Sequence, residues 1–159
     1  MKKKFLFLIL VFVMALGLVG CSANDKVFDK NDFKITLTDS FKEDSYEGFN
    51  YYFISSKSAL TVLKESFTDL EQINLNSDSS LDDYATAVLK ANNKNIEVKK
   101  ETNFYYFTYD ATINDNKYYY LSAIVKGKDA FWLINFFGMY NDKDTLETEF
   151  LKYAKTIEV

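Results

Sequence analysis

The chain has 159 residues, a formal net charge of −4 and no histidine, arginine or proline. Without histidine it lacks Ser-His and Cys-His nucleophile pairs, imidazole metal ligands and an imidazole proton carrier, and without arginine it lacks the bidentate clamp for phosphate or carboxylate. An acidic chain is also a poor partner for nucleic acid, whose phosphates require a basic surface. The composition therefore weighs against an enzyme, a bound cofactor and a histidine metal site. Lysine as the sole strong base, with abundant Asn, Ile, Phe and Tyr, is typical of an AT-rich genome and favours a low-GC Gram-positive source.

The sequence opens with a secretory signal over residues 1–20. Lys2–Lys4 supply positive charge, residues 5–19 form an almost unbroken apolar run, and Leu18-Val19-Gly20 lead into Cys21. This order defines a signal peptide, and the apolar run is shorter than the ~20 residues that span a bilayer. The Leu-Val-Gly-Cys sequence resembles the bacterial lipobox, in which processing enzymes attach a diacylglycerol to the thiol and cleave before the cysteine. An ordinary cleaved signal or an uncleaved anchor would leave the position of this single cysteine unexplained.

Cleavage before Cys21 leaves 139 residues, the size of one ordinary domain. Residues 21–32 are polar and predict a lipidated tether, and residues 33–159 predict a single folded domain. The mature chain carries 16 lysines against 23 acidic residues, a formal charge of −7. We therefore expect a protein held at the outer face of the cell membrane by the lipid on Cys21, with an acidic body that stands off an anionic surface.

Alternating apolar and polar residues predict strands in the first half of the domain. The segment 33–38 alternates at period two, and segments 49–55 and 59–67 flank a Ser56-Lys57-Ser58 turn. The polar segment 68–79 predicts no clear element. A helix should begin after Ser80, because an N-cap serine, first-turn carboxylates and an apolar stripe from Leu81 to Leu89 follow one another.

The second half predicts a weak strand at 95–101, a three-stranded meander and a closing helix from Asn141. The meander strands span 104–114, 118–126 and 129–138, and are rich in aromatic and β-branched residues. A two-residue turn at Gly127-Lys128 would pair Val125 with Ala130. A three-residue loop at 115–117 would place Phe107, Tyr109, Ala111 and Ile113 on the same face as Leu121 and Trp132.

The opposite face of this meander is apolar as well. Tyr118, Tyr120, Phe131 and Phe137 share it, so the face must be covered or must present a binding surface. If it were open, these four side chains would form a platform for a glycan or peptide. The competing interpretation, which we favour, is that aromatic residues simply fill the core of the sheet.

Acidic residues offer a second, weaker hypothesis. Asp78, Asp82, Asp83, Asp142 and Asp144 supply oxygen ligands of the type that calcium prefers. However, the calcium-loop pattern is absent, and four of the five lie where helix starts attract negative charge. The sequence predicts no metal site and selects no catalytic pair of carboxylates.

The order of elements resembles the PsbP/Mog1/DcrB-like superfamily and its lipidated bacterial members. The matching features are an opening strand and turn at 33–41, strands ending in Glu65-Ser66-Phe67, a helix announced by Ser80-Leu81-Asp82-Asp83-Tyr84, a meander containing Tyr118-Tyr119-Tyr120, and a closing helix containing Phe150-Leu151-Lys152. The resemblance covers residues 33–159 and implies an α+β domain whose antiparallel sheet is sandwiched by helices. Asp39-Ser40 departs from the pattern, which usually has a proline there. The resemblance implies accessory or interaction proteins without a shared reaction, so it transfers a fold and no site.

Three functions follow from these observations. The first is a non-enzymatic, lipid-anchored extracytoplasmic domain that binds a surface partner or supports a complex. The second is a lipoprotein that binds a small ligand or glycan through the aromatic face of the sheet. The third is a hydrolase that uses carboxylates alone, and the lack of histidine and arginine argues against it.

Overall fold

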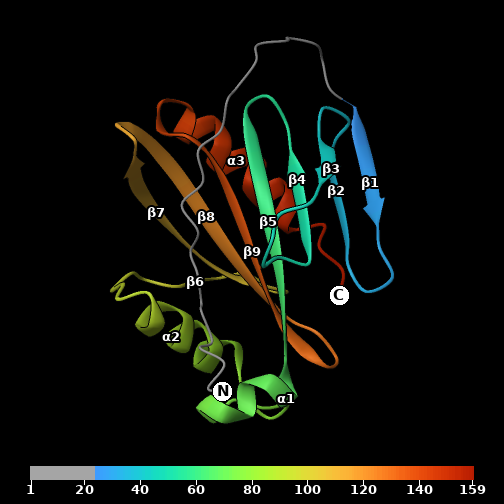
Figure 1. Cartoon of the computed structure of the whole chain (residues 1–159), viewed down its shortest axis with the longest axis vertical. Coiled ribbons are helices and arrows are strands. Elements are labelled where there is room, and N and C mark those ends of the chain that lie inside the picture. The colour runs from blue at the N-terminus through green and yellow to red at the C-terminus, as the bar shows by residue number, and fades with distance from the viewer. Residues whose placement is uncertain (1–23) are drawn as a thin grey trace.

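A computed structural model describes residues 24–159 (Figure 1). A seven-stranded antiparallel sheet forms its centre, in the order β3-β4-β5-β9-β8-β7-β6. Its strands are β3 (Lys42–Asp44), β4 (Tyr51–Ile54), β5 (Ser58–Ser66), β6 (Lys99–Lys100), β7 (Tyr105–Ile113), β8 (Asn116–Lys126) and β9 (Ala130–Met139). The predicted strands at 33–38, 49–55, 59–67 and in the meander are confirmed to within two residues, whereas the strand expected at 95–101 shrinks to β6.

A separate antiparallel hairpin precedes the sheet. It consists of β1 (Asp25–Asp29) and β2 (Lys34–Thr38), and Phe28 of β1 is 7% exposed and belongs to the core. The tether predicted over residues 21–32 is therefore wrong over most of its length. The polar composition of this segment concealed a strand, because β1 needs a single apolar side chain to pack and obtains its backbone partners from β2.

Two longer and three shorter helical elements complete the fold. They are α1 (Phe67–Leu70), η1 (Glu71–Ile73), α2 (Leu81–Ala91), η2 (Tyr140–Asp142) and α3 (Lys143–Ala154). Within residues 24–159, none of them is long and apolar enough to cross a membrane.

Helix α2 begins directly after Ser80, as predicted, and Ser80 is its N-cap. The Ser80 hydroxyl accepts a hydrogen bond from the Asp83 amide (3.2 Å), and the Asp83 carboxylate accepts one from the Ser80 amide (2.7 Å). This reciprocal capping box satisfies two amides that the helix itself leaves without partners. The helix then buries Tyr84, Ala85, Val88 and Leu89 against the sheet.

The hairpin between β8 and β9 pairs two residues away from the predicted register. Val125 lies opposite Trp132 instead of Ala130, and the three-residue connection 127–129 is closed by a hydrogen bond from the Gly127 amide to the Ala130 carbonyl (2.8 Å). A Cβ on Gly127 would lie 2.9 Å from the Trp132 ring nitrogen, so the tight approach of the indole requires glycine here. Because the shift is even, every side chain keeps its predicted face.

The hairpin between β7 and β8 differs from the prediction by an odd number of residues. Asn114 and Asp115 form a two-residue turn with φ angles of 46° and 63°, which pairs Ile113 with Asn116. Two successive left-handed residues match the twist of a two-residue hairpin. The predicted side of β7 is consequently wrong: Phe107, Tyr109, Ala111 and Ile113 lie on the same side of the sheet as Tyr118 and Tyr120.

Both faces of the sheet are covered, which confirms the predicted α+β sandwich (Figure 1). The first face packs against α3 and the β1–β2 hairpin, with Phe150, Ile35 and Trp132 among its fully buried side chains. The second face packs against α1, α2 and Leu75 of the segment between them. Trp132 is buried on the first face and stacks on Phe33, with 5.6 Å between the ring centroids.

Candidate functional site

The four aromatic residues considered as a ligand platform lie in the core of the second face. Tyr118, Tyr120, Phe131 and Phe137 are each at most 1% exposed. Tyr84 of α2 stacks on Phe131 at 4.5 Å, with ring planes 7° apart. The open platform is therefore corrected to a packed interior, because α1, α2 and Leu75 between them cover the face that the sheet alone would expose.

A column of aromatic rings extends this interior across three strands. Tyr109 of β7 stacks on Tyr120 of β8 at 4.8 Å, and Tyr120 stacks on Phe137 of β9 at 5.5 Å. The odd register of the β7–β8 hairpin is what brings Tyr109 into this column. The tyrosines act as large, rigid core residues, and burial raises the pKa of Tyr109 well above its ordinary range.

Glu65 is the one carboxyl group in residues 24–159 that is buried. It lies at the end of β5 on the second face, 8% exposed, and accepts a hydrogen bond from the hydroxyl of Tyr84 on α2. Burial raises the pKa of Glu65 to about 7, the Tyr84 hydrogen bond lowers it, and the charge of Asp69 raises it further. Ala59 and Glu65 are an even number of residues apart in β5 and therefore lie on the same, buried side of the strand. This period of two is the sequence signal that could have predicted the burial of Glu65.

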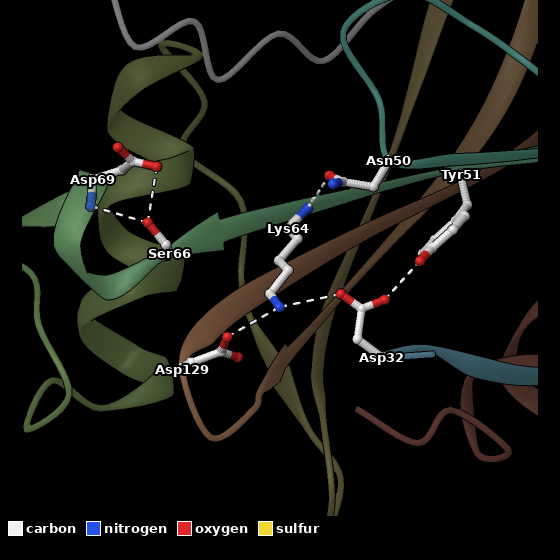
Figure 2. A network of polar contacts seen from close by, with 7 residues as sticks. All are labelled: Asp32, Asn50, Tyr51, Lys64, Ser66, Asp69 and Asp129. Atoms are coloured by element: carbon white, nitrogen blue, oxygen red, sulfur yellow. Dashed lines mark hydrogen bonds and ion pairs between the residues drawn. The ribbon is translucent and has the colours of Figure 1, made fainter. Parts of the chain in front are cut away.

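Lys64, the neighbour of Glu65 in β5, points to the opposite side of the sheet and organises a network of polar contacts (Figure 2). Its ammonium lies 3.1 Å from a carboxylate oxygen of Asp32 and 3.1 Å from one of Asp129. Tyr51 donates a hydrogen bond to the other Asp32 oxygen (2.6 Å). The Lys64 amide donates to the side-chain oxygen of Asn50 (2.7 Å).

This network joins three parts of the chain that are distant in sequence. Asp32 comes from the β1–β2 turn, Lys64 from β5 and Asp129 from the β8–β9 turn, and the Lys64 ammonium also lies 5.2 Å from the centre of the Trp132 ring. The hydrogen bond from Tyr51 lowers the pKa of Asp32, burial opposes this, and Lys64 lowers it again. Each of the three charged groups contacts a group of opposite charge. The network therefore attaches the β1–β2 hairpin to the sheet and leaves none of the three charges unpaired.

The acidic residues weighed as cation ligands have local roles at helix starts and on the surface. Asp83 completes the α2 capping box, and Asp82 forms an ion pair with Lys100 (2.7 Å). Asp144 lies in the first turn of α3 and Asp142 at its N-cap. In residues 24–159, no group of three or more His, Cys, Asp or Glu side chains could hold a metal ion.

An apolar hollow lies on the outer side of α2, where the helix meets η1. It has a volume of about 630 Å³ and is open to solvent; its lining comprises Ile73, Leu75, Asp83, Thr86, Ala87, Lys90 and Ala91. Ile73 is 38% exposed, one of the three large apolar side chains exposed in residues 24–159. Small side chains at Ala87 and Ala91, one helical turn apart, leave room over the helix. No sequence pattern predicts this hollow, because η1 lies in the polar segment 68–79.

Cys21 and the signal segment lie outside the described residues. The first described residue, Asn24, is already fixed: its carbonyl accepts a hydrogen bond from the Asp39 amide at 2.7 Å. The described residues therefore begin three residues after the cysteine that closes the lipobox-like sequence.

The fold is shared with known structures, although sequence comparison finds none of them. No protein-family model matches the sequence, and no curated protein matches it. The solution structure of cyanobacterial PsbP (CyanoP) from Synechocystis sp. PCC 6803 superposes with a TM-score of 0.55 at 14% identity, over 92% of this chain and 98% of that one. LpqN, involved in cell envelope biogenesis of Mycobacterium tuberculosis, gives a TM-score of 0.49 at 9% identity, over 86% of this chain and 91% of that one. The similarity to CyanoP shows that the chain has a PsbP-like fold, as the sequence resemblance implied.

Proposed function

We propose that this chain, a domain with the PsbP-like fold, is a non-enzymatic lipoprotein that is anchored at the outer face of the cell membrane and binds a partner protein there. The observation that carries the proposal is the position of Cys21. It closes a Leu-Val-Gly-Cys sequence after a signal-like apolar run, and Asn24, three residues later, is hydrogen-bonded to Asp39 of the domain. A lipid on this thiol would join the domain to the membrane with almost no chain in between.

The absence of usual catalytic groups supports a binding role. The whole chain lacks histidine and arginine. Glu65, whose raised pKa would suit a general acid, is held by Tyr84 beneath α2 and does not line the hollow. Lys64 is occupied by Asp32 and Asp129.

The hollow between η1 and α2 offers the contact surface for a partner. Its apolar floor and the exposed Ile73 favour a bulky apolar side chain, and Asp83 and Lys90 place opposite charges about two helical turns apart along its rim. The aromatic face of the sheet is closed, so a glycan-binding function through Tyr118, Tyr120, Phe131 and Phe137 has no open surface here.

Two experiments test the two parts of the proposal. Mass spectrometry of the membrane-extracted protein should find a diacylglycerol-modified Cys21 as the first residue, and Cys21→Ala should leave the precursor unprocessed or release it from the membrane. Unchanged processing and membrane retention of the variant would refute the anchor. The second experiment measures crosslinking of surface proteins to position 91, in the lining of the hollow. Ala87→Trp fills the hollow and should abolish this crosslinking, whereas the control Thr68→Trp, on the exposed side of α1, should not. Equal crosslinking in both variants would refute the contact surface.

A further inference from the structure

The path of the chain from Cys21 into β1 restricts how the domain can sit on a membrane. Three residue steps separate Cys21 from Asn24, so the two Cα atoms lie at most about 11 Å apart. Asn24 cannot swing away from the domain, because its carbonyl accepts from the Asp39 amide (2.7 Å) and its side chain contacts the Asp39 carboxylate (3.4 Å). Asp25 is held in addition by Lys152 of α3 (2.8 Å).

The end of the molecule that carries Asn24 is well defined. In Figure 1, β1 begins at the same end as the β2–β3 connection and the β4–β5 turn, while α1, α2 and the β8–β9 turn lie at the opposite end. The polar network agrees with this direction, because Asp32 in the β1–β2 turn contacts Lys64 near the far end of β5. The nine residues of β5 run from one end to the other and span about 30 Å.

We infer that the domain rests on the lipid surface through the end formed by Asn24, Asp39 and Lys57, and that the hollow between η1 and α2 faces away from the membrane. The inference rests on the proposed lipid anchor at Cys21. The surface that this end contacts is the bilayer into which the lipid on Cys21 is inserted. The acidic domain is repelled by an anionic membrane surface, but the segment between Cys21 and Asn24 is too short for the domain to move away from it.

This end carries exposed side chains of both charge signs, the Asp39 carboxylate among them, so it suits contact with lipid headgroups and not entry into the acyl chains. Asp25 is neutralised by Lys152, and Lys57 projects from the β4–β5 turn with an exposed side chain. A lysine near an anionic lipid surface is attracted to it. The far end, by contrast, carries the open apolar hollow, which therefore remains accessible to proteins outside the cell.

Three matched substitutions test the orientation. Each replaces an exposed lysine by cysteine. Lys57→Cys lies in the β4–β5 turn at the end proposed to face the membrane, Lys128→Cys lies in the β8–β9 turn at the opposite end, and Lys90→Cys lies beside the hollow. Lys57 directly precedes β5 and Lys128 directly precedes Asp129, whose carbonyl accepts from the amide of Phe67 just beyond the end of β5. The length of β5 thus separates the two turns. The lipid occupies the Cys21 thiol, so the introduced cysteine is the single free thiol for a fluorescent maleimide.

The labelled, lipidated proteins are bound to phosphatidylcholine–phosphatidylglycerol vesicles that carry a nitroxide quencher on the headgroup. We expect the label at position 57 to be quenched several-fold more strongly than the labels at 128 and 90. Equal quenching at the three positions, or stronger quenching at 128, in protein that sediments fully with the vesicles would overturn the orientation while leaving the anchor intact. Protein that does not sediment, and that labels at Cys21 as well, would instead refute the proposed anchor.

Discussion

The hydroxyl of Tyr84 on α2 donates a hydrogen bond to the carboxylate of Glu65 at the end of β5. This contact links α2, which covers the second face, to the sheet at a point where both side chains are buried. Tyr84 also stacks on Phe131, so the same side chain joins α2 to the sheet by an apolar and a polar contact. The protonation state of Glu65 therefore acts directly on the packing of α2 against the sheet.

The stability of the domain should fall as the pH rises from about 4.5 to above 7. Burial raises the pKa of Glu65 to about 7, so the folded state binds a proton more tightly than the unfolded state does. The resulting contribution is full below the ordinary pKa of a glutamate and is lost as the pH rises through about 7, by at most about 3 kcal/mol. Urea unfolding of the wild type at pH 5.5 and pH 8 measures the difference.

Glu65→Gln is the matched control for this prediction. The amide cannot ionise and retains an oxygen that accepts the Tyr84 hydrogen bond. The variant should lose most of the decline between the two pH values and should be more stable than the wild type at pH 8. A variant with the same pH profile as the wild type would show that another group causes the decline.

Ser80→Ala should destabilise the domain by about 1 kcal/mol. The substitution removes the hydroxyl that accepts from the Asp83 amide and leaves that amide without its partner at the start of α2. Ser80→Thr retains a capping oxygen and should cost less. Denaturant midpoints of the two variants check the prediction, and equal midpoints would contradict the capping role.

Gly138→Ala should destabilise the domain by about 1–3 kcal/mol, because the site is already filled. An added Cβ would lie 2.9 Å from the Lys57 carbonyl oxygen and 2.7 Å from a methyl group of Leu146 on α3. The carbonyl belongs to the backbone and cannot turn aside. Thermal unfolding measures the loss, with Ser56→Ala in the neighbouring turn as a control; a Gly138→Ala variant as stable as this control would contradict the packing.

Lys64→Met should cost at most about 1 kcal/mol, despite the two ion pairs that it removes. Lys64 has a side-chain exposure of 21%, and exposed ion pairs contribute little because water and side-chain entropy offset the attraction. The loss should shrink in 1 M NaCl, where the Debye length is about 3 Å. Urea unfolding at low and high salt measures both effects, and a loss that salt does not change would indicate that the methionine acts through packing on Trp132 instead.

Short-range patterns in the sequence determined much of this protein. Periodicity located the main strands, the capping box located the start of α2, and apolar residues on both faces of the meander required a sheet that is covered twice. These features depend on neighbours within one turn or one strand, and a single sequence contains that information. The lipobox is a local pattern too, and the anchoring that it implies stays a prediction.

The tertiary structure decided the features that depend on contacts between distant segments. The side of β7 depended on whether the β7–β8 turn has two residues or three, since a one-residue change moves every side chain to the other face. The strand β1 depended on β2 for its backbone hydrogen bonds, and the burial of Tyr118 and Phe131 depended on a helix from another part of the chain. The sequence by itself thus determined what most segments are, and only the folded chain decided which segments meet, because a packed face is shared by residues that no local pattern connects.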